Sequence, residues 1–262
     1  MTLLSSKADQ LKALDADFAS SLKLSTSLYN YFFNYKEYYH LLNTYIARPL
    51  GLVCCPYCNR NYISSVVTVD GERIIGPTYD HYFHKDKYRF LTLSFYNLIP
   101  SCYICNSNLK GTDDFDLTTH LYPYDDEFGD MVKFDFDLGL INSGKSKEIV
   151  FEPTITCNPA ISTSMRYKLY GGSNNKHGSI KVFKLEEIYK SHFDTVEEIY
   201  TKFDQNSKHY LASIQELLDL LKVTEQDFYR FHFNNYYNIQ NFHLRPLAKL
   251  TRDIYDKMKS LQ

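Results

Sequence analysis

Tryptophan is absent from this chain of 262 residues, and so is any run of about 18 apolar residues. Without such a run, we expect no helix that crosses a membrane. The N-terminal stretch MTLLSSKADQLKALDADF has no apolar signal-peptide core and carries acidic residues early. These two absences predict a cytoplasmic protein with no membrane partner.

A large excess of charge of either sign is also missing, since the formal net charge is −2 at pH 7. A value near zero neither supports nor excludes nucleic acid binding, which depends on a local basic face. The most one-sided segment runs from Asp113 to Asp137, where nine carboxylates accompany a single lysine. Such a segment usually forms a solvated face, although it could also repel nucleic acid or hold a basic partner.

Aromatic residues are abundant, with 24 Tyr and 18 Phe. Tyrosine adds apolar area together with a hydroxyl that needs a partner, which is typical of a semi-polar core or a large interface. In the first part of the chain these residues recur every three or four positions, which predicts helices that end before Pro49.

Periodicity and turn signals divide the chain into four regions. Helical periodicity dominates both ends, and signals for short strands lie between them. We therefore expect an α+β fold in which a compact module is embedded in a mostly helical scaffold with a small antiparallel β insertion. The regions are a helical region (1–48), the module (49–112), a small region of strands and loops (113–180) and a second helical region (181–262).

Within the module, β-branched residues flank an Asp-Gly pair, which predicts a hairpin over 66–75. Short strands at 78–83 and 97–101 precede a helix over 102–110 that ends at Gly111. The β insertion is predicted from alternating stretches, and the C-terminal helices from apolar periodicity. These elements are strands at 132–138 and 148–151, and helices at 185–202, at 209–221, from Thr224 and at 247–261.

Two Cys-x-x-Cys pairs bracket the strands of the module. Paired cysteines at this spacing each supply two thiolates from one tight turn, and four thiolates suit a tetrahedral zinc ion. Buried free thiols or a redox pair are the alternatives, but no thioredoxin-type unit accompanies the first pair. Cys54 competes with Cys55 for the first position, which the two-residue gap favours for Cys55. We expect a closed, structural zinc site made of Cys55, Cys58, Cys102 and Cys105.

Asp80 and His81 lie between the two cysteine pairs, and Asn106 follows the last cysteine. Hydrolysis of a phosphodiester needs a base that activates water and a divalent ion that stabilises the developing charge. An Asp carboxylate and an Asn amide oxygen are suitable ligands for Mg²⁺ or Mn²⁺. The set predicts metal-assisted cleavage of nucleic acid, because the closed zinc site itself has no open position for water.

The order of these residues resembles the HNH endonuclease family, whose members have a ββα-metal fold. The resemblance covers about a fifth of the chain. It implies that His81 is the general base and that Asp80 and Asn106 hold the catalytic metal. It also implies that Asn97 orients the histidine strand by hydrogen bonds across the following loop. The matching residues are Cys55, Cys58, Asp80, His81, Asn97, Leu98, Cys102, Cys105, Asn106 and Lys110.

Contacts to the substrate are expected from basic residues of the same module. The resemblance implies that Lys110 lies near a phosphate, and His84 and Lys85 are further candidates. Two departures from the family pattern concern these residues. Many relatives have proline where His84 stands, and the lysine after the last cysteine pair usually comes one residue earlier than Lys110.

The flanks, which end in RPLAKLTRDIYDKM, resemble stand-alone bacterial HNH effectors encoded beside ABC-type ATPases, as in Septu-type and retron phage-defence systems. This resemblance implies an effector of anti-phage defence that cuts DNA, with RNA as a further substrate. Its helical regions would then dock an ATPase partner. The alternative is a zinc-stapled nucleic-acid-binding or adaptor protein without catalysis, and a nuclease kept silent until its partner releases it is also compatible with the sequence.

Overall fold

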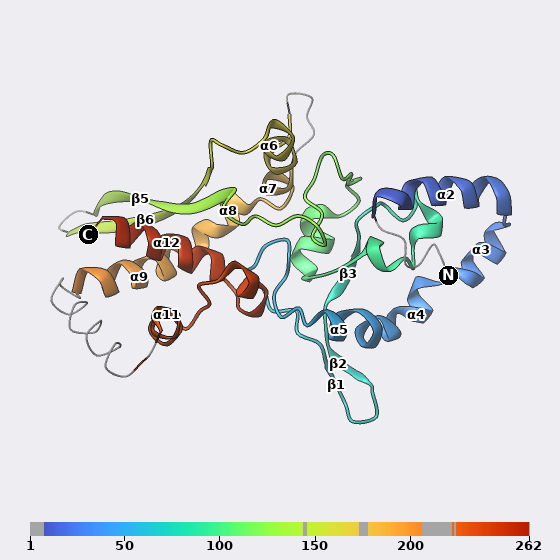
Figure 1. Ribbon diagram of the computed structural model, residues 1–262, viewed down its shortest axis with the longest axis horizontal. Helices are drawn as coiled ribbons and strands as arrows, with labels where there is room; N and C mark the ends of the chain where they lie inside the picture. Colours follow the sequence, from blue (N-terminus) through green and yellow to red (C-terminus); the bar gives the residue numbers. More distant parts are fainter. Residues whose placement is uncertain (1–7, 144–145, 173–177, 206–221, 223, 262) are drawn as a thin grey trace. The chain divides into compact units, whose positions relative to one another are not determined.

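The computed structural model describes residues 8–143, 146–172, 178–205, 222 and 224–261. Within these ranges the chain is an α+β protein of helices and two-stranded antiparallel sheets (Figure 1). The predicted fold class is therefore confirmed at this level. None of the described helices combines the length and the apolar character that a passage through a bilayer requires.

Two compact units make up the chain. The first consists of Met1–Glu127 and Thr163–Phe183, and the second of Phe128–Ser162 and Lys184–Gln262. The predicted module at 49–112 belongs entirely to the first unit. The predicted region at 113–180 is divided between both units, because the chain leaves the first unit and later returns to it.

The first unit begins with helices, as predicted from the aromatic periodicity. Ser25 caps the second of them, and its hydroxyl accepts a hydrogen bond from Leu28 N at 3.3 Å. The helical stretch does not end before Pro49, because proline is tolerated in the first turn of a helix. It ends at Gly51, whose φ of +61° is in the left-handed region. The elements are α2 (Ala8–Leu22), α3 (Thr26–Phe32), α4 (Tyr35–Leu42), the π-helix η1 (Asn43–Ala47) and α5 (Arg48–Leu50).

Two short antiparallel sheets follow. The predicted hairpin is formed by β1 (Val66–Val67) and β2 (Arg73–Ile75), and Gly71 at φ +86° supplies the turn that the Asp-Gly signal indicates. The second sheet pairs β3 (Thr78–His81) with β4 (Leu98–Ser101). In its register Asp80 lies opposite Ile99 and His81 opposite Leu98. Two 3₁₀ turns, η2 (Arg89–Leu91) and η3 (Phe95–Asn97), connect the two strands.

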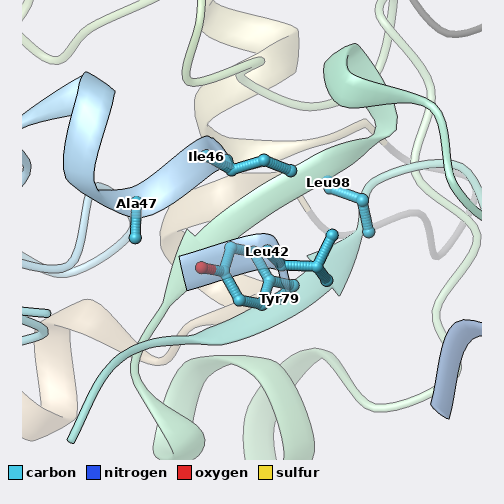
Figure 2. Packing of buried hydrophobic residues seen from close by; sticks show 5 residues of the cluster. All are labelled: Leu42, Ile46, Ala47, Tyr79 and Leu98. Carbon is cyan, nitrogen blue, oxygen red and sulfur yellow. The ribbon is translucent and has the colours of Figure 1, made fainter. Parts of the chain in front are cut away.

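A hydrophobic cluster fixes this second sheet against the N-terminal helices (Figure 2). Leu42, Ile46 and Ala47 of the helical stretch lie against Tyr79 of β3 and Leu98 of β4. Full burial of one large apolar side chain contributes about 1.5–3 kcal/mol. The cluster therefore holds the strand that carries Asp80 and His81 in a fixed position.

The predicted helix after the second cysteine pair is a π-helix, η4 (Ile104–Lys110). Gly111 N donates to Asn106 O at 3.0 Å, a spacing of five residues, and Gly111 at φ +54° ends the element. The first unit also contains two helices that were not predicted, α6 (Thr163–Tyr170) and α7 (Ser179–Val182). The Ser179 hydroxyl accepts a hydrogen bond from Leu121 N at 2.9 Å, which joins α7 to the loop after η4.

The second unit is built on a long hairpin that pairs without interruption from Val132 opposite Cys157 to Ser143 opposite Ser146. The predicted antiparallel strands are thus confirmed, but they are longer than the alternating stretches indicate. Thr224 forms the predicted capping box with Asp227. The predicted helix at 209–221 lies outside the described residues. The elements are β5 (Val132–Ser143), β6 (Ser146–Cys157), α8 (Leu185–Tyr189), η5 (Lys190–His192), α9 (Phe193–Gln205), α11 (Glu225–Phe233), η6 (Ile239–Leu244) and α12 (Ala248–Ser260).

Candidate functional site

The ligand atoms of Cys55, Cys58, Cys102 and Cys105 all lie within 4.8 Å of one another, and all four residues are buried. This set, hereafter the cysteine cluster, joins the two pairs that the sequence separates widely. Among the described residues it is the only group of three or more His, Cys, Asp or Glu side chains close enough to hold a metal ion. The four thiols could hold a metal such as zinc, which favours four thiolates in a closed site.

A tight turn brings the first pair together. Asn59 N donates to Cys55 O at 2.8 Å, and Cys55 N donates to Asn61 O at 3.0 Å. Asn59 adopts a φ of +48°, which asparagine tolerates better than most residues. Cys54 forms a bridge with Tyr62 and lies outside the cluster. The structure thus places Cys55 in the cluster, as the two-residue gap favours.

Two nitrogen donors contact the sulfur of Cys102, the first cysteine of the second pair. Asn61 Nδ2 lies 3.4 Å from Cys102 Sγ, and Cys105 N donates to the same sulfur at 3.4 Å. Hydrogen bonds with Cys105, and then with Cys55 and Cys58, lower the pKa of the Cys102 thiol. The hydrogen bonds with Cys102, and then with Cys55 and Cys58, raise the pKa of the Cys105 thiol in turn. The thiolate is the form that binds a metal.

Asp80 is buried, and two side chains hold its carboxylate. Tyr57 Oη donates to one oxygen at 2.6 Å, and Lys110 Nζ donates to the other at 2.8 Å. Lys110 Nζ also donates to the carbonyl of His81 at 2.7 Å. The structure therefore places Lys110 differently from the expected phosphate contact, because its ammonium is buried in an ion pair.

His81 leaves β3 on the other side from Asp80, as alternation along a strand requires. Its ring lies 4.8 Å from that of Tyr35, and its Nε2 is 3.0 Å from the carbonyl oxygen of Thr92. A carbonyl only accepts, so Nε2 carries the proton and Nδ1 of the neutral ring remains an acceptor. Burial lowers the pKa of His81 to about 4, which keeps the ring neutral at pH 7.

Asn97 is fully buried, and its amide spans the loop between β3 and β4. Its Nδ2 donates to Phe83 O at 3.2 Å and to Leu91 O at 3.1 Å, while its Oδ1 accepts from Phe83 N at 2.7 Å. The side chain thus ties the residues just after His81 to the end of the loop. This is the kind of contact that the HNH resemblance implies for Asn97.

The remaining predicted site residues lie nearer the surface. Asn106 is half-buried on η4, between the cysteine cluster and Lys110 in the chain. His84 begins a turn, and its Nδ1 accepts from Asp86 N at 3.3 Å. Lys85 is exposed, and its charge contributes to the lowered pKa of His81. Of the three expected substrate contacts, His84 and Lys85 remain accessible and Lys110 does not.

Two residues that contact this site were not predicted. Tyr57 lies between the cysteines of the first pair and reaches Asp80, and its ring stacks on Phe183 at 4.4 Å. Asn61 follows the same pair and donates to sulfur. The sequence places both within a few residues of Cys58, but nothing in the pattern shows that either side chain turns towards the site.

No family model, curated protein or solved structure matches this chain. The residues of the site and their geometry are therefore the basis for a function.

Proposed function

We propose that this chain is a metal-dependent HNH endonuclease that hydrolyses phosphodiester bonds of DNA. The observation that carries the proposal is the orientation of His81, whose Nε2 is fixed on the Thr92 carbonyl. The ring is thereby left with one free acceptor nitrogen, and the residue before it in the sequence is acidic. The resemblance to the HNH family supports the same assignment.

In this proposal His81 is the general base. Its neutral Nδ1 takes a proton from a water molecule, and the Thr92 carbonyl holds the ring and stabilises the charge that develops on it. A base must be unprotonated at the working pH, and burial ensures this by lowering the pKa of His81. Asn97 acts as a positioning residue, because it fixes the backbone that follows His81.

Asp80 and Asn106 are the residues that would hold a catalytic Mg²⁺ or Mn²⁺. Their donor chemistry fits, since each offers oxygen and a carboxylate oxygen can accept more than one bond. Such an ion, when bound, would stabilise the charge of the phosphoryl group and of the leaving oxygen. Lys110 and Tyr57 hold Asp80 in its orientation, and exposed Lys85 with His84 would contact the backbone of the nucleic acid.

The experiment is cleavage of supercoiled plasmid, linear DNA and single-stranded RNA with Mg²⁺ or Mn²⁺, comparing the wild type with His81→Ala. The matched control is His40→Ala, because His40 is exposed on α4 and lies outside the module at 49–112. We expect cleavage by the wild type and the control and none by His81→Ala, with equal metal content in all three. Full activity of His81→Ala would remove this residue as the base.

A binding or adaptor function without catalysis is the second candidate, and one observation favours it. Both oxygens of Asp80 already have partners, and one of these is a buried ammonium. If the carboxylate has only this structural role, the wild type should bind DNA without cutting it. DNA affinity would then be equal in the wild type and in Asp80→Asn, with no cleavage by either.

We further propose that the protein is an effector of anti-phage defence that acts with an ABC-type ATPase. Exposed aromatic residues of the N-terminal helices support a protein partner, since Tyr31 is 73% and Phe32 is 56% exposed and no residue of α3 is buried. Cleavage assays should therefore be repeated with the ATPase present. Cleavage that requires the ATPase would identify a gated nuclease.

A further inference from the structure

Arg89 belongs to a basic segment, KDKYR at 85–89, in the loop between β3 and β4. Among the cations of this segment, Lys87 is paired with Asp114. Arg89 is exposed, and within the part of the chain that the structure describes its guanidinium group has no hydrogen bond and no ion pair. The loop therefore presents a guanidinium group whose N–H donors are available to a ligand.

Tyr29 of α3 holds this guanidinium group in place. The Arg89 Cζ atom lies 3.9 Å from the centroid of the Tyr29 ring. The Tyr29 hydroxyl also donates to the Arg89 carbonyl, so one tyrosine contacts both the side chain and the backbone of Arg89. A ring face attracts the positive charge but bonds none of the N–H groups. The donors of Arg89 thus stay free while their position is restricted.

Arg73 shows how an arginine over a tyrosine ring differs when its role is structural. Its guanidinium lies 4.9 Å from the centroid of the Tyr39 ring, but it also donates to the carbonyls of Gly76 and Pro77 at 2.7 and 3.0 Å. Those bonds fasten the chain after β2. The guanidinium of Arg89 fastens no carbonyl or carboxylate among the described residues, so a contact outside the chain is left as its use.

The same tyrosine connects Arg89 with the candidate general base. Tyr29 Oη lies 2.9 Å from Thr92 Oγ1, and the Thr92 carbonyl oxygen lies 3.0 Å from His81 Nε2. Arg89 is therefore linked to the Thr92 side of the His81 ring. The second ring nitrogen, Nδ1, points in another direction, and the proposed chemistry takes place there. A ligand of Arg89 would thus lie beside the reacting phosphate and not at it.

We propose that Arg89 binds a phosphate that flanks the scissile one on the DNA strand, and that Tyr29 holds the guanidinium group in its binding orientation. This proposal rests on the proposed nuclease function, because it takes DNA as the ligand. A guanidinium group can donate two parallel bonds to one phosphate, and a donor that is held beforehand loses less conformational freedom on binding. Such a contact fixes the register of the strand at His81 without reading its sequence.

Binding of a short DNA duplex, measured by fluorescence anisotropy without added Mg²⁺ or Mn²⁺ over a series of salt concentrations, tests this contact. Arg89→Gln should bind about tenfold more weakly, and its slope of log affinity against log salt should be shallower by about one unit. Arg89→Lys keeps the charge but not the fork, so it should recover the slope and only part of the affinity. The matched control is Arg230→Gln, because Arg230 is exposed and lies 4.7 Å from the Tyr236 ring in the second unit.

A purely structural role for Arg89 predicts a different result. Arg89→Gln would then melt at a lower temperature and keep the salt slope of the wild type. We expect instead an unchanged melting temperature with the shallower slope, and wild-type binding by Arg230→Gln. Unchanged affinity and slope in Arg89→Gln, or an equal loss in Arg89→Gln and Arg230→Gln, would overturn the proposal.

Cleavage kinetics with Mg²⁺ separate this contact from the nuclease function itself. Arg89→Gln should raise KM and leave kcat nearly unchanged, because a flanking contact is equally strong before and during the reaction. A lower kcat with an unchanged KM would place Arg89 at the scissile phosphate and overturn the assignment. DNA binding that depends on Arg89, without cleavage by any of the proteins, would remove the nuclease function but keep the phosphate contact. Absence of DNA binding by the wild type would overturn both.

Discussion

Replacement of Lys110 by methionine tests the most deeply buried ion pair of the first unit. The side chains of Lys110 and Asp80 are 1% and 3% exposed, and the ammonium also donates to the His81 carbonyl. Methionine keeps the apolar stem but leaves the carboxylate with Tyr57 as its remaining side-chain partner. Breaking a buried pair from one side typically costs about 3–5 kcal/mol, so we expect a loss of this size in the free energy of unfolding.

A double variant, Lys110→Met with Asp80→Asn, makes this prediction specific. The neutral amide removes the unpaired charge and can still accept from the Tyr57 hydroxyl, so most of the lost stability should return. Urea denaturation of the wild type, both single variants and the double variant gives the coupling energy directly. A loss below about 1 kcal/mol in Lys110→Met would show that the pair is not buried in solution.

Lys87→Met is the matched control, because Lys87 forms an ion pair with Asp114 on the surface. This variant should denature like the wild type.

DNA binding by Lys110→Met tests whether Lys110 contacts phosphate or only holds Asp80. A lysine that contacts phosphate contributes about one unit to the slope of log affinity against log salt. We expect that slope to be unchanged in Lys110→Met. A shallower slope would show that Lys110 does contact a phosphate.

Three further predictions concern the same unit. Tyr57→Phe keeps the ring but removes a bond to a charged group, so it should lose about 1.5–3 kcal/mol of stability in urea denaturation; an unchanged midpoint would contradict the bond to Asp80. Because the pKa of His81 is lowered from 6.5 to about 4 in the folded state, the unfolded chain binds more protons between these values. The free energy of unfolding should therefore fall by roughly 3 kcal/mol as the pH drops from 6.5 to 4. The fall should be smaller in His81→Gln when both proteins are measured without added Mg²⁺. Metal analysis should find about one zinc per chain in the wild type and in Cys54→Ser, because Cys54 is not part of the cysteine cluster. Cys102→Ser should hold well under one zinc per chain, and equal zinc in the two variants would refute this.

Local chemistry explains which parts of the fold could be predicted from the sequence. The hairpin at 66–75 needs a residue with positive φ in its turn, which Gly71 supplies. An Asp-Gly pair in a sequence predicts such a turn, so this hairpin could be predicted. Each Cys-x-x-Cys pair likewise predicts a tight turn. Four thiols can bind one metal ion only when the two pairs meet, so the spacing also predicts the buried cluster. By contrast, α6 and α7 are short and have no strong apolar period, so packing rather than pattern determines them.

The contacts within the site were harder to predict, because they depend on which way a side chain turns. Lys110 carries a charge, and a charged residue is expected at the surface unless a partner accompanies it. Its partner, Asp80, lies 30 residues earlier in the chain. Only the pairing of β3 with β4, followed by η4, brings the two together. Sequence reasoning could name both residues, but not their contact.

The position of Tyr57 connects the cysteine cluster with Asp80. Because Tyr57 lies between Cys55 and Cys58, the turn that gathers these thiols also sets where the tyrosine hydroxyl points. The second pair positions Lys110 in the same way, because η4 starts within this pair and ends at Lys110. Both side chains that hold Asp80 are therefore anchored to the cluster, one through each pair. A metal bound by the cluster would thus fix the orientation of this carboxylate without contacting it.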